Sequence, residues 1–366
     1  MQYDMHYYGT YALAAAAGIP PKDAEVIAMS AQLIDDHNFT ELKTFPDEHG
    51  NKGEGIEGVA TAHHPVDSGV RAAFDGRIAH DDSRKVWVPF HFLPGNSGAS
   101  FQQRMVCQKN SPIARKMMDF YTDQASVDAH RPHALHLMGV AAHVYCDTFA
   151  HYGFLGIDSH LNSVDLNSIQ PDEAAHTEGL AAYLRQHVTD FLDRFELEIA
   201  SLTPIGHGSV GTSPDQPYLR WRYTYIDRDG NPGATVTRNN PADYLEACQA
   251  LHQYFHQFAN AYYGPTQCVP FTSIAPTLTK IIACHGIADQ RIAEWMAAMH
   301  ANQLGPATPP TKYDPERWIN TMMAASKLVT DDGSDIAHAY NFFAAASYHQ
   351  NYVLKRLLPE VGLYVV

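Results

Sequence analysis

The chain has 366 residues, of which 45% are hydrophobic, enough to bury a large core. Its formal charge of -15, from 40 acidic and 25 basic side chains, disfavours a surface for nucleic acid. The five cysteines are scattered without a Cys-x-x-Cys pair, which excludes a thiolate zinc site and fits a reducing compartment. Because histidine is unusually frequent, with 22 residues, any transition metal would be held by imidazole and carboxylate groups.

The N-terminal run MQYDMHYYGTYALAAAAGIPP does not have the pattern of a signal peptide. It lacks a basic start and carries Asp4 and His6 ahead of its apolar part. No stretch reaches the roughly 18 uninterrupted apolar residues of a membrane span. We therefore expect a cytoplasmic protein without a transmembrane segment, and leave open export by a signal-independent route and peripheral contact with a membrane.

Helical periodicity recurs along most of the chain. Residues 21–37, PKDAEVIAMSAQLIDDH, form an amphipathic pattern that begins at a proline and ends near Asp35 and Asp36. Residues 40–100 are rich in Gly, Pro, Asp and His, which predicts long ordered loops with room for a short strand. Further helices are expected at about 112–128, 132–152, 171–200, 241–262, 274–302, 314–329 and 334–357.

A second irregular stretch precedes the helices of the C-terminal half. Alternating aromatic residues on either side of DGNPG predict a hairpin at about 219–238. The expected fold is mostly α, a multi-helix bundle with long ordered loops and one small β-hairpin. We expect a single domain in which residues 1–265 form a helical core with loop insertions at about 40–110 and 201–240, and residues 266–366 add helices packed on that core.

The predicted helix at about 132–152 carries an unusual polar row. At intervals of seven, four and four residues, HALHLMGVAAHVYCDTFAH contains His136, His143, Asp147 and His151. With His143 at zero, helical geometry places the other three at about +20°, +40° and +80°, so all four project from one face. The other faces are apolar and bury the helix, so Asp147 needs a partner that no Lys or Arg of this helix provides.

Two interpretations of this row remain. In the ordinary one, His143 and Asp147 form a hydrogen-bonded pair inside a core. Three histidines and one aspartate on one face favour the second, metal ligation, because ionisable groups are rarely buried without partners. Gly139 lies beside the row at a cost of about 1 kcal/mol relative to alanine, which indicates close approach of a neighbouring helix or of a metal cluster and its other ligands.

A metal site of this kind recruits ligands from several segments. Asp35 and Asp36 end a helix, where the macrodipole disfavours anions, so a bound cation would account for them. The candidates in loops and at helix ends are Asp4, His6, Asp35, Asp36, His37, His63, His64, His91, His207 and Asp215. Two of these candidates have a second interpretation of equal weight: His91 as a histidine packed in the core, and Asp215 as a turn residue. Histidines treated as surface or core residues are His252, His256, His285, His300, His338 and His349.

The run HLMGVAAHVYCDTFAH resembles the central helix of the zinc-dependent phospholipase C and single-strand nuclease superfamily, in which His is followed by Asp four residues later and then by another His. The four-residue step from Asp147 to His151 is most similar to the glycosylphosphatidylinositol-specific phospholipase D branch. A wider pattern, YDMHYYGTYALA with SAQLIDD, TAH, PFHFLPG and GHG...PD.PYL.W.Y, is similar to a family of uncharacterised bacterial proteins grouped with that superfamily.

This resemblance implies an α-helical bundle of phospholipase C and nuclease type whose site holds two or three zinc ions. The N-terminal tryptophan that binds zinc in secreted members is absent from this chain. Carried over position by position, the implied ligands are His6, Asp35 or Asp36, His63, His143, Asp147, His151, His207 and Asp215.

Divalent ions in such a site would activate water and bind phosphodiester oxygens, so we expect a metal-dependent phosphoester hydrolase of phospholipase C type. Either Asp35 or Asp36 would accept the proton of the attacking water, and either His91 or His136 would orient the water or protonate the leaving group. A phospholipid or a small phosphoester is the favoured substrate, since the negative charge makes nucleic acid unlikely.

Two alternative functions stay open at this point. One is a metal-stabilised structural or binding protein without turnover, which predicts metal ligand shells closed by protein. The other is a His-Asp type nucleotide phosphohydrolase, for which the chain offers only the dipeptide His80-Asp81.

Overall fold

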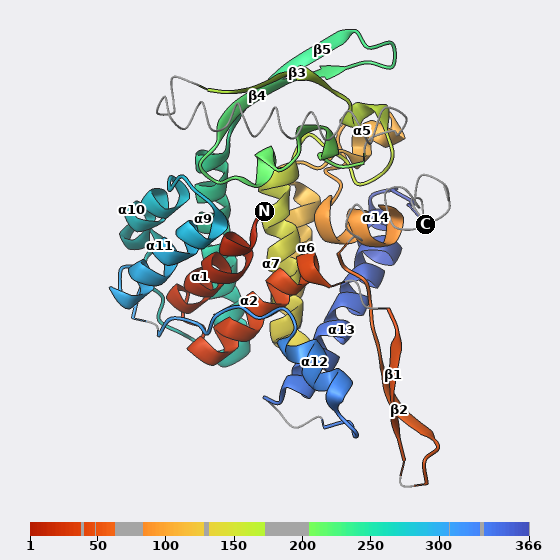
Figure 1. Cartoon of the computed structure of the whole chain (residues 1–366), viewed down its shortest axis with the longest axis vertical. Coiled ribbons are helices and arrows are strands. Elements are labelled where there is room, and N and C mark those ends of the chain that lie inside the picture. Colours follow the sequence, from red (N-terminus) through yellow and green to blue (C-terminus); the bar gives the residue numbers. More distant parts are fainter. Residues whose placement is uncertain are drawn as a thin grey trace.

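The computed structural model confirms a mostly α-helical chain. Helix α7 (Ala134–His151) runs through the middle of the helical body (Figure 1). Every residue of α7 except Leu135 is buried, as its apolar sequence requires. The residues that the structure describes are 1–37, 40–47, 49–62, 83–127, 132–172, 205–306, 308–329 and 333–365.

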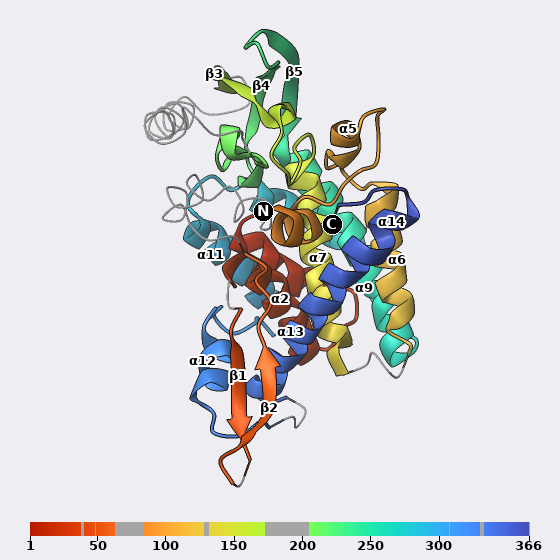
Figure 2. The same ribbon diagram turned by 90° about the vertical axis from the view of Figure 1, so that its right-hand side faces the viewer.

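Four helices pack directly against α7 and bury its sides (Figure 2). These are α2 (Pro21–Asp36), α6 (Pro112–Gln124), α9 (Asn240–Tyr263) and α13 (Asp335–Tyr352). The shorter α-helices are α1 (Thr10–Ala16), α5 (Phe101–Met105), α10 (Phe271–Ile282), α11 (Ala288–His300), α12 (Arg317–Ala324) and α14 (Leu358–Glu360). Wider π-helical turns occupy Asp4–Gly9, Ser83–His91 and Val353–Leu357, and 3₁₀ turns occupy His160–Asn162, Gly208–Val210 and Ser213–Asp215.

One large cluster of buried side chains runs from Met1 to Val365 and includes residues of both the N-terminal and the C-terminal helices. The predicted helix at about 274–302 is wrong as a single element, because α10 and α11 are separate helices. Gly286 lies between them with φ of 145°, a conformation that interrupts a helix. Most of the helix predicted at about 171–200 falls outside the described residues.

Two small sheets lie at opposite ends of the molecule (Figure 1). The predicted hairpin is confirmed as β4 (Arg220–Ile226) and β5 (Pro232–Asn239), which pair antiparallel. The sequence did not predict β3 (Val164–Pro171), which pairs with β4, because VDLNSIQP lacks a clean alternation of polar and apolar residues. In the antiparallel hairpin of β1 (Leu42–Pro46) and β2 (Lys52–Glu57), glycine and proline obscure the pattern.

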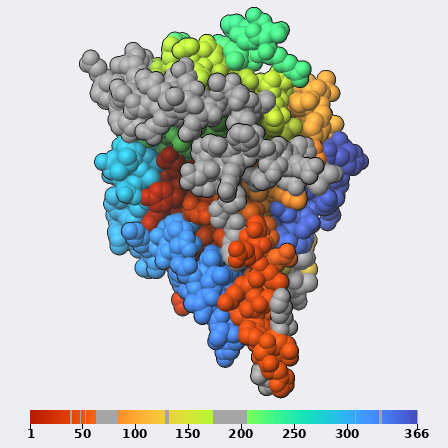
Figure 3. All heavy atoms as spheres, turned by 45° about the vertical axis from the view of Figure 1, so that its right-hand side comes forward, coloured from red at the N-terminus to blue at the C-terminus, as the bar shows by residue number. Residues whose placement is uncertain are grey.

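The β1–β2 hairpin projects from the body of the protein, as the space-filling view shows (Figure 3). The three-stranded sheet instead covers a second group of buried side chains that includes Phe92, Phe154, Trp221 and Tyr223. Within the described part of the chain, no helix combines the length and the apolarity that crossing a membrane requires.

A buried histidine makes the stability of this fold depend on pH. His349 of α13 is fully buried, and its Nδ1 and Nε2 lie 2.9 Å from Tyr121 Oη and 2.8 Å from the carbonyl oxygen of Pro89. Burial lowers the pKa of His349 to about 4, below the value near 6.5 of an unfolded histidine. Its contribution to stability is therefore present above about pH 6.5 and is lost as the pH falls toward 4.

We expect the free energy of unfolding of the wild type to fall by about 2 kcal/mol more than that of His349→Gln between pH 7 and pH 5. Urea denaturation of the metal-free proteins at both pH values measures this difference. Equal losses in the two proteins would contradict the assignment of this pH dependence to His349.

Candidate metal centre

Helices α2 and α7 approach each other closely where the polar row begins. A Cβ atom added at Gly139 of α7 would lie 2.3 Å from the carbonyl oxygen of Ile27 and 2.7 Å from Cβ of Ser30, both on α2. Of the two explanations for Gly139, close approach of a neighbouring helix is therefore correct. The contact brings Asp35, near the end of α2, beside the polar row of α7.

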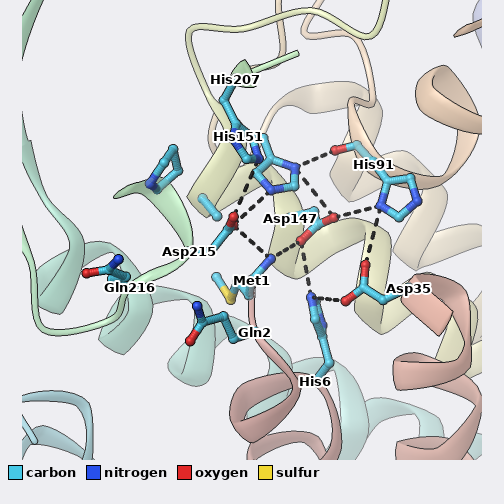
Figure 4. A network of polar contacts seen from close by, with 12 residues as sticks. Met1, Gln2, His6, Asp35, His91, Asp147, His151, His207, Asp215 and Gln216 are labelled. Atoms are coloured by element: carbon cyan, nitrogen blue, oxygen red, sulfur yellow. Dashed lines mark hydrogen bonds and ion pairs between the residues drawn. The ribbon is translucent and has the colours of Figure 1, made fainter. Parts of the chain in front are cut away.

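Eight side chains from α7, α2 and several loops and turns meet around the C-terminal half of α7 (Figure 4). They form three groups in which the candidate ligand atoms all lie within 4.8 Å of one another. The groups are His6 with His143 and Asp147, Asp35 with His91 and His143, and His151 with His207 and Asp215.

Asp147 is at the centre of this cluster. Its Oδ1 lies 3.2 Å from His6 Nε2, and its Oδ2 lies 3.2 Å from His143 Nε2 and 3.4 Å from His91 Nδ1. The Met1 amine donates a hydrogen bond of 2.7 Å to Oδ1, a partner that sequence reasoning did not identify. The expectation that a buried Asp147 needs partners is therefore confirmed, and the partners come from three segments: the N-terminal residues 1–9, the turn Ser83–His91 and α7 itself.

The third group extends the cluster toward the three-stranded sheet. His151 Nε2 lies 3.1 Å from Asp215 Oδ1, and His207 Nε2 lies 3.5 Å from Asp215 Oδ2. His207 and Asp215 belong to turns between residues 205 and 219, far from α7 in sequence. The alternative of Asp215 as a simple turn residue does not account for these contacts.

Three histidines of the cluster are oriented by backbone carbonyl groups. His91 Nε2 lies 2.9 Å from the carbonyl oxygen of Thr61, and His207 Nδ1 lies 2.8 Å from that of Gly211. His151 Nδ1 lies 2.9 Å from the carbonyl oxygen of His91. When the rings are neutral, each of these nitrogens donates its proton to a carbonyl oxygen, and the other ring nitrogen presents a lone pair to the cluster, as in histidines that bind metals. No residue type in the sequence signals these carbonyl contacts.

Lone pairs and carboxylates facing each other require cations between them. His91 Nδ1 and His143 Nε2 are 3.4 Å apart, too close for both to carry a proton directed at the other. In the described part of the chain, the Met1 amine is the one cation other than histidine that contacts a carboxylate of the cluster, and it contacts Asp147 and Asp215 but not Asp35. Negative charge at the largely buried Asp147 and Asp215 is stable only when it is compensated by cations.

The donor set fits a divalent transition metal. It consists of five imidazoles and three carboxylates, the ligands that zinc and related ions bind in the absence of thiolates. His6 Nδ1 and His143 Nδ1 are buried without hydrogen-bond partners among the described residues. Cys146 is also buried on α7, but burial raises the pKa of its thiol well above the ordinary value, so it remains protonated.

The electrostatics keep Asp147, His207 and His6 in the protonation states that metal binding requires. Burial opposes ionisation of Asp147, but His151, the Met1 amine and His143 hold its pKa well below the usual value. Burial lowers the pKa of His207 to about 4 and that of His6 well below its ordinary value. Ionised carboxylate and neutral imidazole are the forms that bind metals, so these three groups release few protons on binding. Burial raises the pKa of Asp35, and the contacts with Asp147 and Asp35 outweigh burial and raise that of His91, so these two groups release protons when a metal binds.

Two of the residues predicted for the site lie elsewhere. Asp36 is not a ligand candidate, because its Oδ2 accepts hydrogen bonds from Gln32 Nε2 at 3.1 Å and Tyr313 Oη at 2.6 Å. His136 lies two turns before His143, about 10 Å along the helix axis, and its Nε2 contacts His338 Nδ1 at 3.1 Å. The structure thus favours Asp35 of the two adjacent aspartates and corrects the assignment of Asp36 and His136.

Two other sequence predictions fall outside the described residues. His63, implied as a ligand by resemblance, lies there, and so does the dipeptide His80-Asp81 on which a His-Asp phosphohydrolase would depend. His91, predicted to orient water or to donate a proton, is itself among the candidate ligands. Asp4, a further candidate, instead binds Arg291 through Oδ2 at 2.8 Å.

The adjacent aspartates provide a matched pair of variants. Asp35→Asn removes a charge from the cluster and should lower zinc affinity by at least about 10-fold. Loss of a residue that only hydrogen-bonds to a metal ligand already lowers metal affinity by about this factor. Asp36→Asn should leave zinc affinity unchanged, since its carboxylate contacts Gln32 and Tyr313 instead. Competition with a chromogenic zinc chelator measures both, and equal effects would contradict the placement of Asp35.

A buried arginine holds the end of α7 that carries His151. Arg238 of β5 is fully buried and donates hydrogen bonds to the carbonyl oxygens of Ala150, at 2.6 Å, and Tyr152, at 3.2 Å. Its guanidinium group also lies 3.6 Å from the centre of the Tyr152 ring. These carbonyls belong to the last turn of the helix, which lacks partners within the helix and favours a cation.

Arg238→Met should therefore lower the free energy of unfolding by about 2–4 kcal/mol, because buried carbonyls lose their donors. Arg222→Met is the control, since Arg222 lies on the neighbouring strand β4, is exposed and bonds to Gln170. We expect a change below about 0.5 kcal/mol there. Urea denaturation compares the two, and similar losses would show that the helix end does not depend on Arg238.

A cavity of about 600 Å³ opens beside the cluster. The side chain of Asp35 is 29% exposed, whereas that of Asp147 is 1% exposed, so the cluster meets the cavity through Asp35. The described residues that line the cavity include Gln2, Tyr3, Gln32, Asp35, Asp36, Gln216, Tyr218, Arg291 and Tyr313. A small molecule that enters it reaches the edge of the cluster.

Searches for similar proteins assign a family but no activity. Among curated proteins and among solved structures, no match to the chain was found. A family of unknown function, DUF6765, matches residues 1–357, and the chain therefore belongs to this family.

Proposed function

We propose that this protein is a metal-dependent phosphoester hydrolase of phospholipase C type, with two or three zinc ions as the cofactor. One observation carries the proposal: eight imidazole and carboxylate side chains converge with ring nitrogens and carboxylate oxygens facing one another. Bound divalent ions of this kind polarise a phosphoester and lower the pKa of water, the chemistry that phosphoester hydrolysis needs.

The chain's own residues divide into holding and reacting roles. His6, His143 and Asp147 are buried and serve to hold ions. Asp35 both lines the cavity and belongs to the cluster, so it is the carboxylate placed to accept a proton from the attacking water. Asp36 and His136, which sequence reasoning also considered for proton transfer, do not face the cluster.

The cavity favours a phospholipid headgroup or a small phosphoester over a nucleic acid. Among the described residues that line it, Arg291 is the only basic one. Its guanidinium group already binds Asp4 at 2.8 and 2.9 Å, and Asp35 and Asp36 add negative charge. A strand with many phosphates would find little compensating charge here, whereas a single phosphate would be compensated by metal ions.

Hydrolysis assays on zinc-loaded protein test the proposal. The substrates are bis(p-nitrophenyl) phosphate, p-nitrophenyl phosphate and a phospholipid in detergent micelles. We expect turnover of at least one of them, lost on chelation and restored by zinc, and unaffected in His300→Ala, at an exposed histidine of α11. If the wild type binds zinc firmly but hydrolyses none of the three, the alternative of a metal-stabilised structural or binding protein is favoured.

A further inference from the structure

A second pair of histidines lies at the other end of α7, away from the cluster. His136 is in the first turns of α7 and His338 is on α13, and both line a cavity of about 1010 Å³. Figure 1 shows α12 beside the ends of α7 and α13 in this region. Sequence reasoning assigned His136 to the cluster and His338 to the surface or core, so neither assignment accounts for the pair.

We propose that His136 and His338 form a second metal-binding site, which takes a divalent transition metal through two imidazole nitrogens. His136 Nε2 and His338 Nδ1 are 3.1 Å apart. Two imidazoles that share one metal at about 2.0–2.1 Å in tetrahedral geometry have their nitrogens about 3.3 Å apart. The separation of the two nitrogens is therefore within a few tenths of an ångström of that in a chelating pair, and binding requires the two rings to turn so that both lone pairs point to the ion.

Aromatic packing holds the two rings in place. Trp318 of α12 stacks on His338, with ring centres 5.0 Å apart and planes inclined by 21°. The same indole lies 5.5 Å from the ring centre of His136. Because packing fixes the two rings, little further conformational freedom is lost when an ion binds.

His136 is the more deeply buried of the two histidines. His136 is 2% exposed, and its Nδ1 is buried without a hydrogen-bond partner among the described residues. Burial, with smaller effects of His338 and His133, lowers the pKa of His136 well below its ordinary value.

The cavity leaves room for the other positions around the ion. Its described lining contains three carboxylates, of Asp23, Glu25 and Asp314, which offset the charges of its three basic side chains, of Lys22, Lys312 and Arg317. Arg317 is itself paired with Asp335 at 3.1 Å. A cation bound to the two histidines is therefore not repelled by a net positive charge, and the cavity admits water or a small ligand to the open positions.

Copper and zinc titrations of the metal-free full-length protein test this site independently of the proposed hydrolysis. We expect His338→Ala to bind one ion fewer per chain than the wild type and to keep the ions of the cluster. Asp147→Ala should lose ions of the cluster and keep the ion at His136 and His338. Electron paramagnetic resonance of the copper forms should show, in Asp147→Ala, a species with two nitrogen ligands that is missing when His338→Ala is added.

Two separate variants of the pair are compared, so that the ion count does not depend on the correct folding of a single variant. His338 is half-buried on a helix that tolerates alanine, and His136→Ala must lose the same ion. His300→Ala, at an exposed histidine of α11, is the control and should bind as many ions as the wild type. Equal ion counts in the wild type, His338→Ala and His136→Ala would overturn the proposal and leave the pair as a hydrogen bond between neutral imidazoles.

Discussion

Replacing Asp147 by asparagine is expected to remove most of the zinc and to lower phosphoester hydrolysis by more than about 100-fold. Loss of a residue that only hydrogen-bonds to a metal ligand already lowers metal affinity or activity by up to about 100-fold. The carboxylate lies within 3.5 Å of His6, His91, His143 and His151, so its charge is shared by the whole cluster. Asparagine has the same shape but no charge, so the fold should survive while the metal is lost.

Metal content by plasma mass spectrometry and hydrolysis rates on the same preparations measure both effects. Asp36→Asn is the control for metal content, because Asp36 is next to Asp35 in sequence but bonds to Gln32 and Tyr313. Zinc content in Asp147→Asn equal to that of the wild type would show that Asp147 is only a buried hydrogen-bonding group.

Gly139→Ala is expected to lower the free energy of unfolding by roughly 2 kcal/mol. The added methyl group would lie 2.3 Å from the carbonyl oxygen of Ile27, a backbone atom that cannot rotate away. Overpacking of this kind costs about 3 kcal/mol at the upper end, against a gain of about 1 kcal/mol from the better helix propensity of alanine. The steric cost therefore wins, and α2 moves away from α7.

The same displacement should weaken metal binding, since α2 carries Asp35 and α7 carries His143. Urea denaturation of the metal-free protein and zinc competition measure the two effects. Gly208→Ala is the control for stability, because an added Cβ there has no atom of the described structure within 4 Å. A Gly139→Ala protein as stable as the wild type would contradict the tight contact between the two helices.

The sequence was most informative where one helix carried the signal. The angles of His143, Asp147 and His151 around the helix axis were enough to predict that they share one buried face, and the structure brings their side chains together. The same calculation included His136, because a projection down the axis does not show that it lies about 10 Å away from His143 along the helix. Distance along the helix axis therefore limits what such a projection predicts.

Other parts of the site depend on contacts that no local pattern contains. Asp35 and Asp36 differ by about 100° on α2, and which of them faces the cluster depends on how α2 packs against Gly139. His207 and Asp215 reach His151 through turns whose paths are set by tertiary structure. In the same way, β3 is a strand because it pairs with β4, although its own sequence has weak strand character.

Anomalous diffraction from crystals of the zinc-loaded protein, recorded at the zinc absorption edge, tests the central claim most directly. The account predicts anomalous peaks at the groups formed by His6, His91, His143, His151 and His207 with the three aspartates, and a coordination position open toward the cavity beside Asp35. Ordered crystals without anomalous density at these side chains would show that the cluster is a buried polar network and that metal-dependent hydrolysis is not its function.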